Sequence, residues 1–169
     1  MREGRNVKKD EIDLLYQKYY YSLFLFAFSL THQKADAEDL VMNTFVKALL
    51  SFEDGNLKAW LYTVLKNEFY NMTKKKKYVY TQTEIHFDCF QSSDDVLKEC
   101  IHEEHKRWLY KNIYQLPKIE REVILLSVQD DLSDVEISQI LNISVNYMRV
   151  IRYRVKEKLR KLSIEEDYL

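Results

Sequence analysis

The sequence has few of the residues that interrupt helices, since glycine occurs twice and proline once in 169 residues. Strands joined by tight turns depend on such residues, so their scarcity argues against strands and favours an all-helical chain. Cysteine is equally scarce, because Cys89 and Cys100 cannot build a disulfide framework and fit a reducing compartment. The apolar run from Leu23 to Phe28 is far too short to cross a bilayer, and it predicts a buried helix instead.

Charge is nearly balanced over the whole chain but unevenly distributed along it. The formal net charge is -1, so no overall excess of basic charge indicates a polyanionic partner. Local fields steer a charged partner, however, and the segment from Arg149 to Lys161 is strongly basic. Aromatic residues make up 14% of the chain, a content that suits both helix packing and base stacking.

Apolar residues at helical spacing predict three helices in the first half of the chain. The first runs from Asp10 to Leu30, and the second has Asp36 near its start, where a carboxylate favours the helix dipole. A loop at 52–56 leads to the third helix, which spans 57–73 and ends in a run of lysines at 74–77. The predicted buried stripe of the second helix is Leu40, Val41, Thr44, Phe45, Ala48 and Leu49. We call residues 8–77 the first module.

The helical pattern is lost between residues 78 and 94, and we interpret this polar segment as a flexible linker. Helical spacing resumes at Val96 and continues through Ile113. Pro117 then interrupts the pattern and suits the first position of a further helix. We call residues 95–163 the second module. The predicted fold class is therefore all-α, with two small helical domains joined by a flexible linker.

The most informative segment is a predicted helix-turn-helix between residues 132 and 162. Ser133 and Glu136 have the spacing of a capping box, in which each side chain bonds the backbone of the other residue. Asn142 follows the first helix, where the turn needs a left-handed residue, and Ser144 can cap the second helix. That second helix is basic, and such a helix fits the major groove of DNA when a short turn holds it across a partner.

Several short motifs in the first module resemble region two of the bacterial sigma factors. They are Asp36-Ala37-Glu38-Asp39-Leu40-Val41, Thr44-Phe45, Trp60-Leu61-Tyr62 and Asn67. Motifs in the second module resemble region four of the same family. These are Leu116-Pro117, Arg121-Glu122-Val123, Glu136-Ile137, Ile140-Leu141 and Ile143-Ser144. Both sets, in this order in so short a chain, look most like the extracytoplasmic-function (ECF) branch, and the resemblance covers nearly everything except the linker and the two ends.

The resemblance implies that the first module binds the β′ coiled coil of core RNA polymerase and opens the minus-ten element of promoter DNA. It implies polymerase contacts at Asp39, Met42 and Asn43. The family usually has Gln and an acidic residue at the last two positions, so the interface is either more apolar here or different in affinity. The expected minus-ten contacts are Asn56, Lys58, Lys66, Asn67, Tyr70 and Lys74.

Some of these residues also have simpler interpretations. Asn56 offers the donors and acceptors that a flipped base needs, and Gly55 lets the backbone approach closely. Asn67 could instead serve as an internal hydrogen-bonding residue, and the lysine run that begins at Lys74 could be only a solvated helix end.

For the second module, the resemblance implies that the last helix reads the minus-thirty-five element and that the module touches the β flap of the polymerase. The expected DNA contacts are Ser144, Asn146, Tyr147, Arg149, Val150, Tyr153 and Arg154. Arginine is the usual reader of guanine, which makes Arg149 the leading candidate for a base contact. Arg152 stands where the family usually has an aliphatic residue, beside Ile151. A small rotation of the helix could bury Ile151 and expose Arg152, so we assign Arg152 no base contact.

We therefore expect a non-enzymatic promoter-specificity subunit without cofactor or metal. A metal enzyme would need partner ligands that the cluster Glu99, Cys100, His102 and His105 lacks. A stand-alone helix-turn-helix regulator that acts without core polymerase remains the main alternative, although it leaves the motifs of the first module unexplained. The resemblance also implies an anti-sigma factor as a partner. Since no secretory apolar segment is evident, we expect a cytoplasmic location and no membrane insertion.

Overall fold

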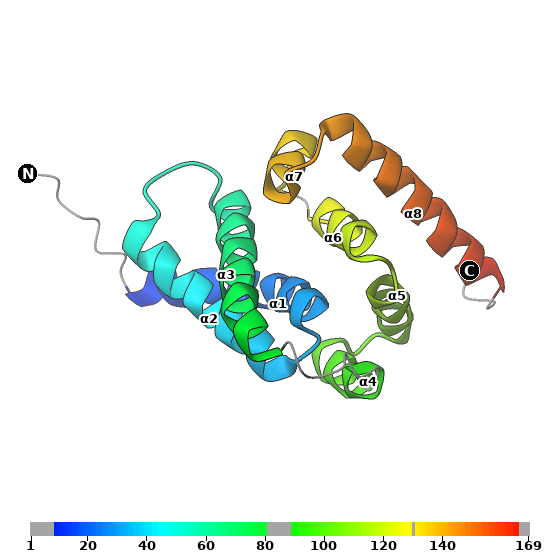
Figure 1. Ribbon diagram of the computed structural model, residues 1–169, viewed down its shortest axis with the longest axis horizontal. Helices are drawn as coiled ribbons and strands as arrows, with labels where there is room; N and C mark the ends of the chain where they lie inside the picture. Colours follow the sequence, from blue (N-terminus) through cyan, green and yellow to red (C-terminus); the bar gives the residue numbers. More distant parts are fainter. Residues whose placement is uncertain (1–8, 81–88, 130, 166–169) are drawn as a thin grey trace, which may run out of the picture.

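The computed structural model describes residues 9–80, 89–129 and 131–165, and every regular element in these ranges is an α-helix (Figure 1). This confirms the predicted all-α class. The helices are α1 (Lys9–Thr31), α2 (Lys34–Ser51), α3 (Leu57–Tyr80), α4 (Cys89–Cys100), α5 (Glu104–Tyr114), α6 (Lys118–Ser127), α7 (Asp134–Leu141) and α8 (Val145–Glu165). None of these helices is long and apolar enough to cross a membrane.

Helices α1, α2 and α3 pack on one another and form the body of the first module. Leu23 and Phe26 of α1 are buried together with Val41 of α2 and Leu65 of α3, and each of the four side chains is at most 1% exposed. The Phe26 ring also meets the Tyr62 ring of α3 edge-on, with 5.2 Å between the ring centroids. This edge-to-face geometry is favourable for aromatic pairs.

Helix α1 buries more than one face because it also packs against the second module. The Phe28 ring lies 5.5 Å from the Tyr114 ring of α5, and the Tyr114 hydroxyl donates to the Leu25 carbonyl at 3.1 Å. The apolar run from Leu23 to Phe28 therefore lies between the two modules, which explains why it lacks an amphipathic pattern. The prediction of a buried helix here is confirmed.

Helix α6 is the centre of the second module and packs against α1, α5, α7 and α8. All of its residues from Arg121 to Leu126 are buried, as expected for a helix with neighbours on every side. The buried Arg121 guanidinium donates to the carbonyls of Tyr114 at 3.0 Å and of Leu116 at 3.4 Å. It thereby satisfies backbone acceptors in the connection between α5 and α6.

The structure differs from the sequence-based expectation in several helix boundaries. Helix α3 continues to Tyr80 and α4 begins at Cys89, so the predicted linker 78–94 is helical at both ends, while its residues 81–88 lie outside the described ranges. The single helix expected from Val96 to Ile113 is two helices, separated at residues 101–103. Pro117 lies just before α6 rather than at its first position.

Candidate nucleic-acid and polymerase interface

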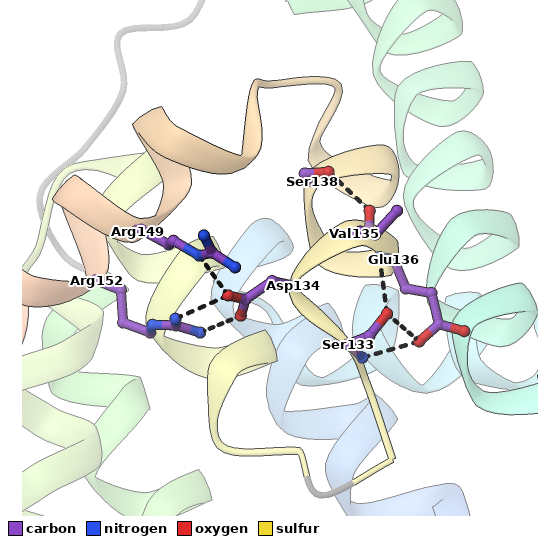
Figure 2. Close-up of polar contacts among 7 residues, drawn as sticks. All are labelled: Ser133, Asp134, Val135, Glu136, Ser138, Arg149 and Arg152. Atoms are coloured by element: carbon purple, nitrogen blue, oxygen red, sulfur yellow. Dashed lines mark hydrogen bonds and ion pairs between the residues drawn. The ribbon is translucent and has the colours of Figure 1, made fainter.

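The start of α7, whose capping box is drawn in Figure 2, and the turn between α7 and α8 have the local geometry that the sequence predicts. Ser133 Oγ accepts from the Glu136 amide at 3.2 Å, and Glu136 Oε2 accepts from the Ser133 amide at 2.8 Å. This capping box is confirmed, and the hydrogen bond from the Ser133 backbone lowers the pKa of the Glu136 carboxyl. Asn142 ends α7 in the left-handed conformation with φ of 54°. Ser144 then caps α8, because its Oγ accepts from the Tyr147 amide at 3.2 Å.

Helix α8 separates an apolar face from an exposed basic face. Met148, Ile151, Val155 and Leu159 are buried against the second module. The residues expected to contact the minus-thirty-five element are all exposed, namely Ser144, Asn146, Tyr147, Arg149, Val150, Tyr153 and Arg154. The structure thus brings these residues together on one accessible surface around the start of α8.

One acidic residue lies beside this surface and was missed by the sequence analysis. Asp134, at the start of α7, accepts from Arg149 Nε at 2.7 Å and from two nitrogens of Arg152 at 2.6 and 3.2 Å (Figure 2). The hydrogen bonds from Arg152 and Arg149 lower the pKa of Asp134 to about 2. Ile151 is buried, as the rotation considered above would require, but Arg152 is only partly buried rather than fully exposed. The arginines lie 15 and 18 residues beyond Asp134, and no helical spacing links them to it.

The expected polymerase contacts share an exposed face of α2. Asp39, Met42 and Asn43 are all exposed. The same face continues with Val46, which is 49% exposed, and Leu50, which is 79% exposed. These two apolar residues follow Met42 at intervals of four, outside the buried stripe, and that spacing is the signal that could have found them. Leu49, by contrast, was expected in the core and is 37% exposed, so that expectation was wrong.

The expected minus-ten contacts fall into two groups. Asn67, Tyr70 and Lys74 are exposed along α3. Asn56, Lys58 and Lys66 instead make polar contacts with residues of the second module.

Asn56 uses both ends of its amide group. Its Oδ1 accepts from the amides of Lys58 at 3.0 Å and Ala59 at 3.2 Å, and so caps the start of α3. Its Nδ2 donates to the Asp131 carbonyl and to Glu136 Oε1, both at 2.8 Å. The Lys58 ammonium lies 3.8 Å from the Asp131 carboxylate. The second module thus occupies hydrogen-bonding groups that were expected to contact a DNA base and a phosphate.

Within the described residues, Lys66 makes the most buried ion pair between the modules. Its Nζ lies 3.0 Å from Glu122 Oε2 of α6, and the two side chains are 8% and 2% exposed. The second Glu122 oxygen lies 3.9 Å from Lys118 Nζ, and it has no hydrogen-bond partner among the described residues. Lys66 therefore cannot reach a phosphate while α3 and α6 are packed in this way.

The histidine and cysteine cluster does not form a metal centre within the described residues, where no group of three or more His, Cys, Asp or Glu side chains could hold a metal ion. Glu99 instead forms an ion pair with Lys34 of α2, and His102 is exposed in the connection between α4 and α5.

Two family models match the chain. Residues 15–78 match Sigma-70 region 2, and residues 106–159 match Sigma-70 region 4. The first segment contains most of α1, all of α2 and most of α3, and the second contains most of α5, all of α6 and α7, and most of α8.

Two curated proteins of Bacillus subtilis (strain 168) are similar over nearly their whole length. The chain is 31% identical to the ECF RNA polymerase sigma factor SigM over 155 residues. This alignment covers 89% of this chain and 94% of that protein. The chain is 29% identical over 159 residues to the RNA polymerase sigma factor YlaC, with 90% and 92% covered.

Two solved structures have a similar fold. CnrH in complex with the cytosolic domain of CnrY matches with a TM-score of 0.58 and 21% identity over 92% of this chain and 88% of that one. The sigma factor RpoE in complex with the anti-sigma factor NepR from Bartonella quintana matches with a TM-score of 0.55 and 25% identity, over 89% and 96% of the two chains.

Proposed function

The chain belongs to the ECF branch of the bacterial RNA polymerase sigma factors, and on that premise we propose how its two modules divide promoter recognition. It directs transcription initiation together with core RNA polymerase. In this proposal residues 8–77 act as region two, residues 78–94 as the linker, and residues 95–163 as region four. The first module binds polymerase and opens the minus-ten element, while the second reads the minus-thirty-five element and touches the β flap.

Polymerase docking is proposed for the exposed face of α2. Asp39, Met42 and Asn43 would contact the β′ coiled coil, with Val46 and Leu50 extending the contact. Two observations support this. Met42 is 50% exposed, and the apolar residues around it form a continuous stripe that has no partner helix within the described residues. Such a stripe is typical of an interaction surface. In this proposal Met42 makes the interface more apolar than in most of the family, and Asn43 leaves it without one acidic side chain.

Minus-ten recognition is proposed for α3 and the loop before it. Asn67, Tyr70 and Lys74 present an amide, an aromatic ring and a cation along one helix, which suits stacking of melted bases and contact with phosphate. Asn56, Lys58 and Lys66 would join them only after the contacts with Asp131, Glu136 and Glu122 break. Promoter opening therefore requires the two modules to move apart.

Minus-thirty-five recognition is proposed for α8. The observation that carries this proposal is that seven expected DNA contacts lie on one exposed, basic surface at the start of a helix that a short turn holds in place. A helix presented in this way enters the major groove, where arginine reads guanine and phosphate contacts set the register.

The remaining properties follow from the family. Sigma factors are not an enzyme family, and we propose neither a catalytic site nor a cofactor. An anti-sigma factor is a further partner, supported by the similar RpoE, whose structure contains the anti-sigma factor NepR. Since bacterial RNA polymerase works on the chromosome, this function supports a cytoplasmic location.

The decisive experiment is run-off transcription with purified bacterial core RNA polymerase, with and without the chain, on a library of promoter fragments. Transcripts that start at defined sites only when the chain is present would support the proposal, and aligning the active fragments would give both promoter elements. Sequence-specific binding of the free chain to duplex DNA without any initiation would refute it and favour a stand-alone regulator.

A further inference from the structure

Asp134 links the two helices of the helix-turn-helix through Arg149, which faces DNA in the proposed function, and through the partly buried Arg152 (Figure 2). Its carboxylate accepts from Arg149 Nε at 2.7 Å through Oδ2. It also accepts from Arg152 Nη1 at 2.6 Å through Oδ1 and from Nη2 at 3.2 Å through Oδ2. One carboxylate on α7 therefore holds two arginines that are three residues apart on α8.

The atom that Arg149 uses in this contact matters for recognition. Within the described residues the hydrogen bond to Asp134 is made by Nε, so both terminal amino groups of Arg149 remain for another acceptor. The side chain is 57% exposed on the basic face of α8. Guanine presents O6 and N7 to the major groove, and a bidentate arginine contact needs two N–H groups in a fixed plane. By binding Nε, Asp134 restricts the rotation of that plane and leaves the terminal amino groups to reach a base.

Arg152 supports this arrangement from behind. Its side chain is 26% exposed, and it binds the carboxylate through two nitrogens, which is the most specific geometry of an arginine–carboxylate pair. Arg149 is a long side chain that would otherwise lose rotamer freedom when it binds a base. The network orders it before DNA arrives. This also accounts for Arg152 at a position where an aliphatic residue is usual in the family.

We propose that Asp134 is a positioning residue for base recognition, which holds Arg149 in the orientation that reads a guanine of the minus-thirty-five element. Arg152 in turn holds Asp134. The proposal rests on the proposed function of α8 and adds the partner on α7 that makes Arg149 selective. A negative charge next to a DNA-binding face repels phosphate, so this aspartate lowers nonspecific affinity while it sharpens the choice of base.

The test measures initiation by the reconstituted holoenzyme on promoters in which each base pair of the minus-thirty-five element is varied. Arg149→Ala should abolish the preference for guanine at one base pair, a preference of roughly 5- to 150-fold for a bidentate contact. Asp134→Ala should reduce the same preference at the same base pair. The double variant should lose no more than Arg149→Ala alone, because both changes act on one interaction.

Two further variants separate positioning from folding. Asp134→Glu keeps the charge at the start of α7 but displaces the carboxylate, so base preference should fall while the circular dichroism spectrum and thermal midpoint remain near wild type. Glu157→Ala is the matched control, since Glu157 pairs with Arg160 at 3.0 Å on the same helix, and it should leave every base preference unchanged.

Each outcome decides a separate question. If Asp134→Ala and Asp134→Glu lower initiation on all promoters by one common factor, Asp134 is only structural and the proposal is overturned. The proposal is also overturned if Arg149→Ala changes no base preference, or if the Asp134 variants keep the wild-type preference. If the wild-type holoenzyme initiates nowhere, the proposed function itself has failed, and that result is visible before any variant is compared.

Discussion

Removing Glu122 should separate the two modules, because this residue forms the most buried ion pair between them in the part of the chain that the structure describes. In the wild type Glu122 neutralises Lys66 at 3.0 Å, and both side chains are at least 92% buried. Glu122→Ala would leave the buried Lys66 ammonium without its carboxylate, near the Tyr70 ring at 5.8 Å and near Lys118, a second ammonium that lies 3.9 Å from Glu122. Breaking one partner of such a pair costs about 3–5 kcal/mol.

The cost need not unfold either module, since Lys66 regains water as soon as α3 and α6 separate. A penalty of about 3 kcal/mol shifts the ratio of packed to separated chains more than about 100-fold towards separation. We therefore expect Glu122→Ala to increase the radius of gyration measured by small-angle X-ray scattering, with little loss of helix content by circular dichroism. The Asn56, Lys58 and Lys66 side chains would then become accessible to DNA.

The double variant Lys66→Met/Glu122→Leu tests whether the unpaired Lys66 charge is what separates the modules in Glu122→Ala. One Glu122 oxygen lacks a hydrogen-bond partner among the described residues, so the wild-type pair is incompletely satisfied. Replacing both residues by apolar side chains should therefore restore close packing, because such replacements are often neutral or stabilising by about 1–4 kcal/mol. Glu157→Ala, which removes only an exposed ion pair on α8, should change nothing. If Glu122→Ala keeps both the wild-type radius and the wild-type thermal midpoint, the reasoning is refuted.

Three further predictions concern α2, Asp134 and the turn before α8. Met42→Asp should weaken binding to core polymerase in a surface-binding assay. It should not lower the thermal midpoint, because Met42 is 50% exposed. Unchanged affinity would exclude this face of α2 as the docking surface. The pKa of Asp134 is lowered from 3.8 to about 2, so the stability contributed by its carboxylate is complete above about pH 4 and is lost as the pH falls towards 2. Urea midpoints should therefore fall more steeply over this range in the wild type than in Asp134→Ala, and equal slopes would contradict the role of the pair. Asn142→Ala should lower the free energy of unfolding by about 1–2 kcal/mol, because alanine tolerates the left-handed φ of 54° poorly. Asn142→Gly should lower it less, because glycine adopts this conformation readily. Equal thermal midpoints for the two variants would contradict this.

Features that depend on neighbours in the sequence were predictable. The capping box of Ser133 and Glu136 joins residues three positions apart. Asn142 adopts the left-handed conformation that the short turn after α7 requires. The family motifs then linked these local features to promoter recognition.

Helix boundaries were less predictable where local signals were ambiguous. The lysine run at 74–77 is compatible with a helix end, yet α3 continues through it to Tyr80. The break between α4 and α5 was missed because apolar residues recur on both sides of it. Leu49 and Val46 of α2 are a second case of an ambiguous local signal. An apolar side chain does not by itself indicate whether it packs in the core or lies on an exposed surface.

The sequence by itself determined the helical class, the caps of α7 and α8, and the family whose motifs it carries, because these depend on spacings of a few residues. Only the tertiary structure decided which distant polar and charged groups meet. Glu136 reaches Asn56 across 80 positions, and Asp134 reaches Arg149 and Arg152 around the turn. Such pairs depend on how helices pack, and packing is set by the shapes of buried apolar faces rather than by the charged residues that it brings together.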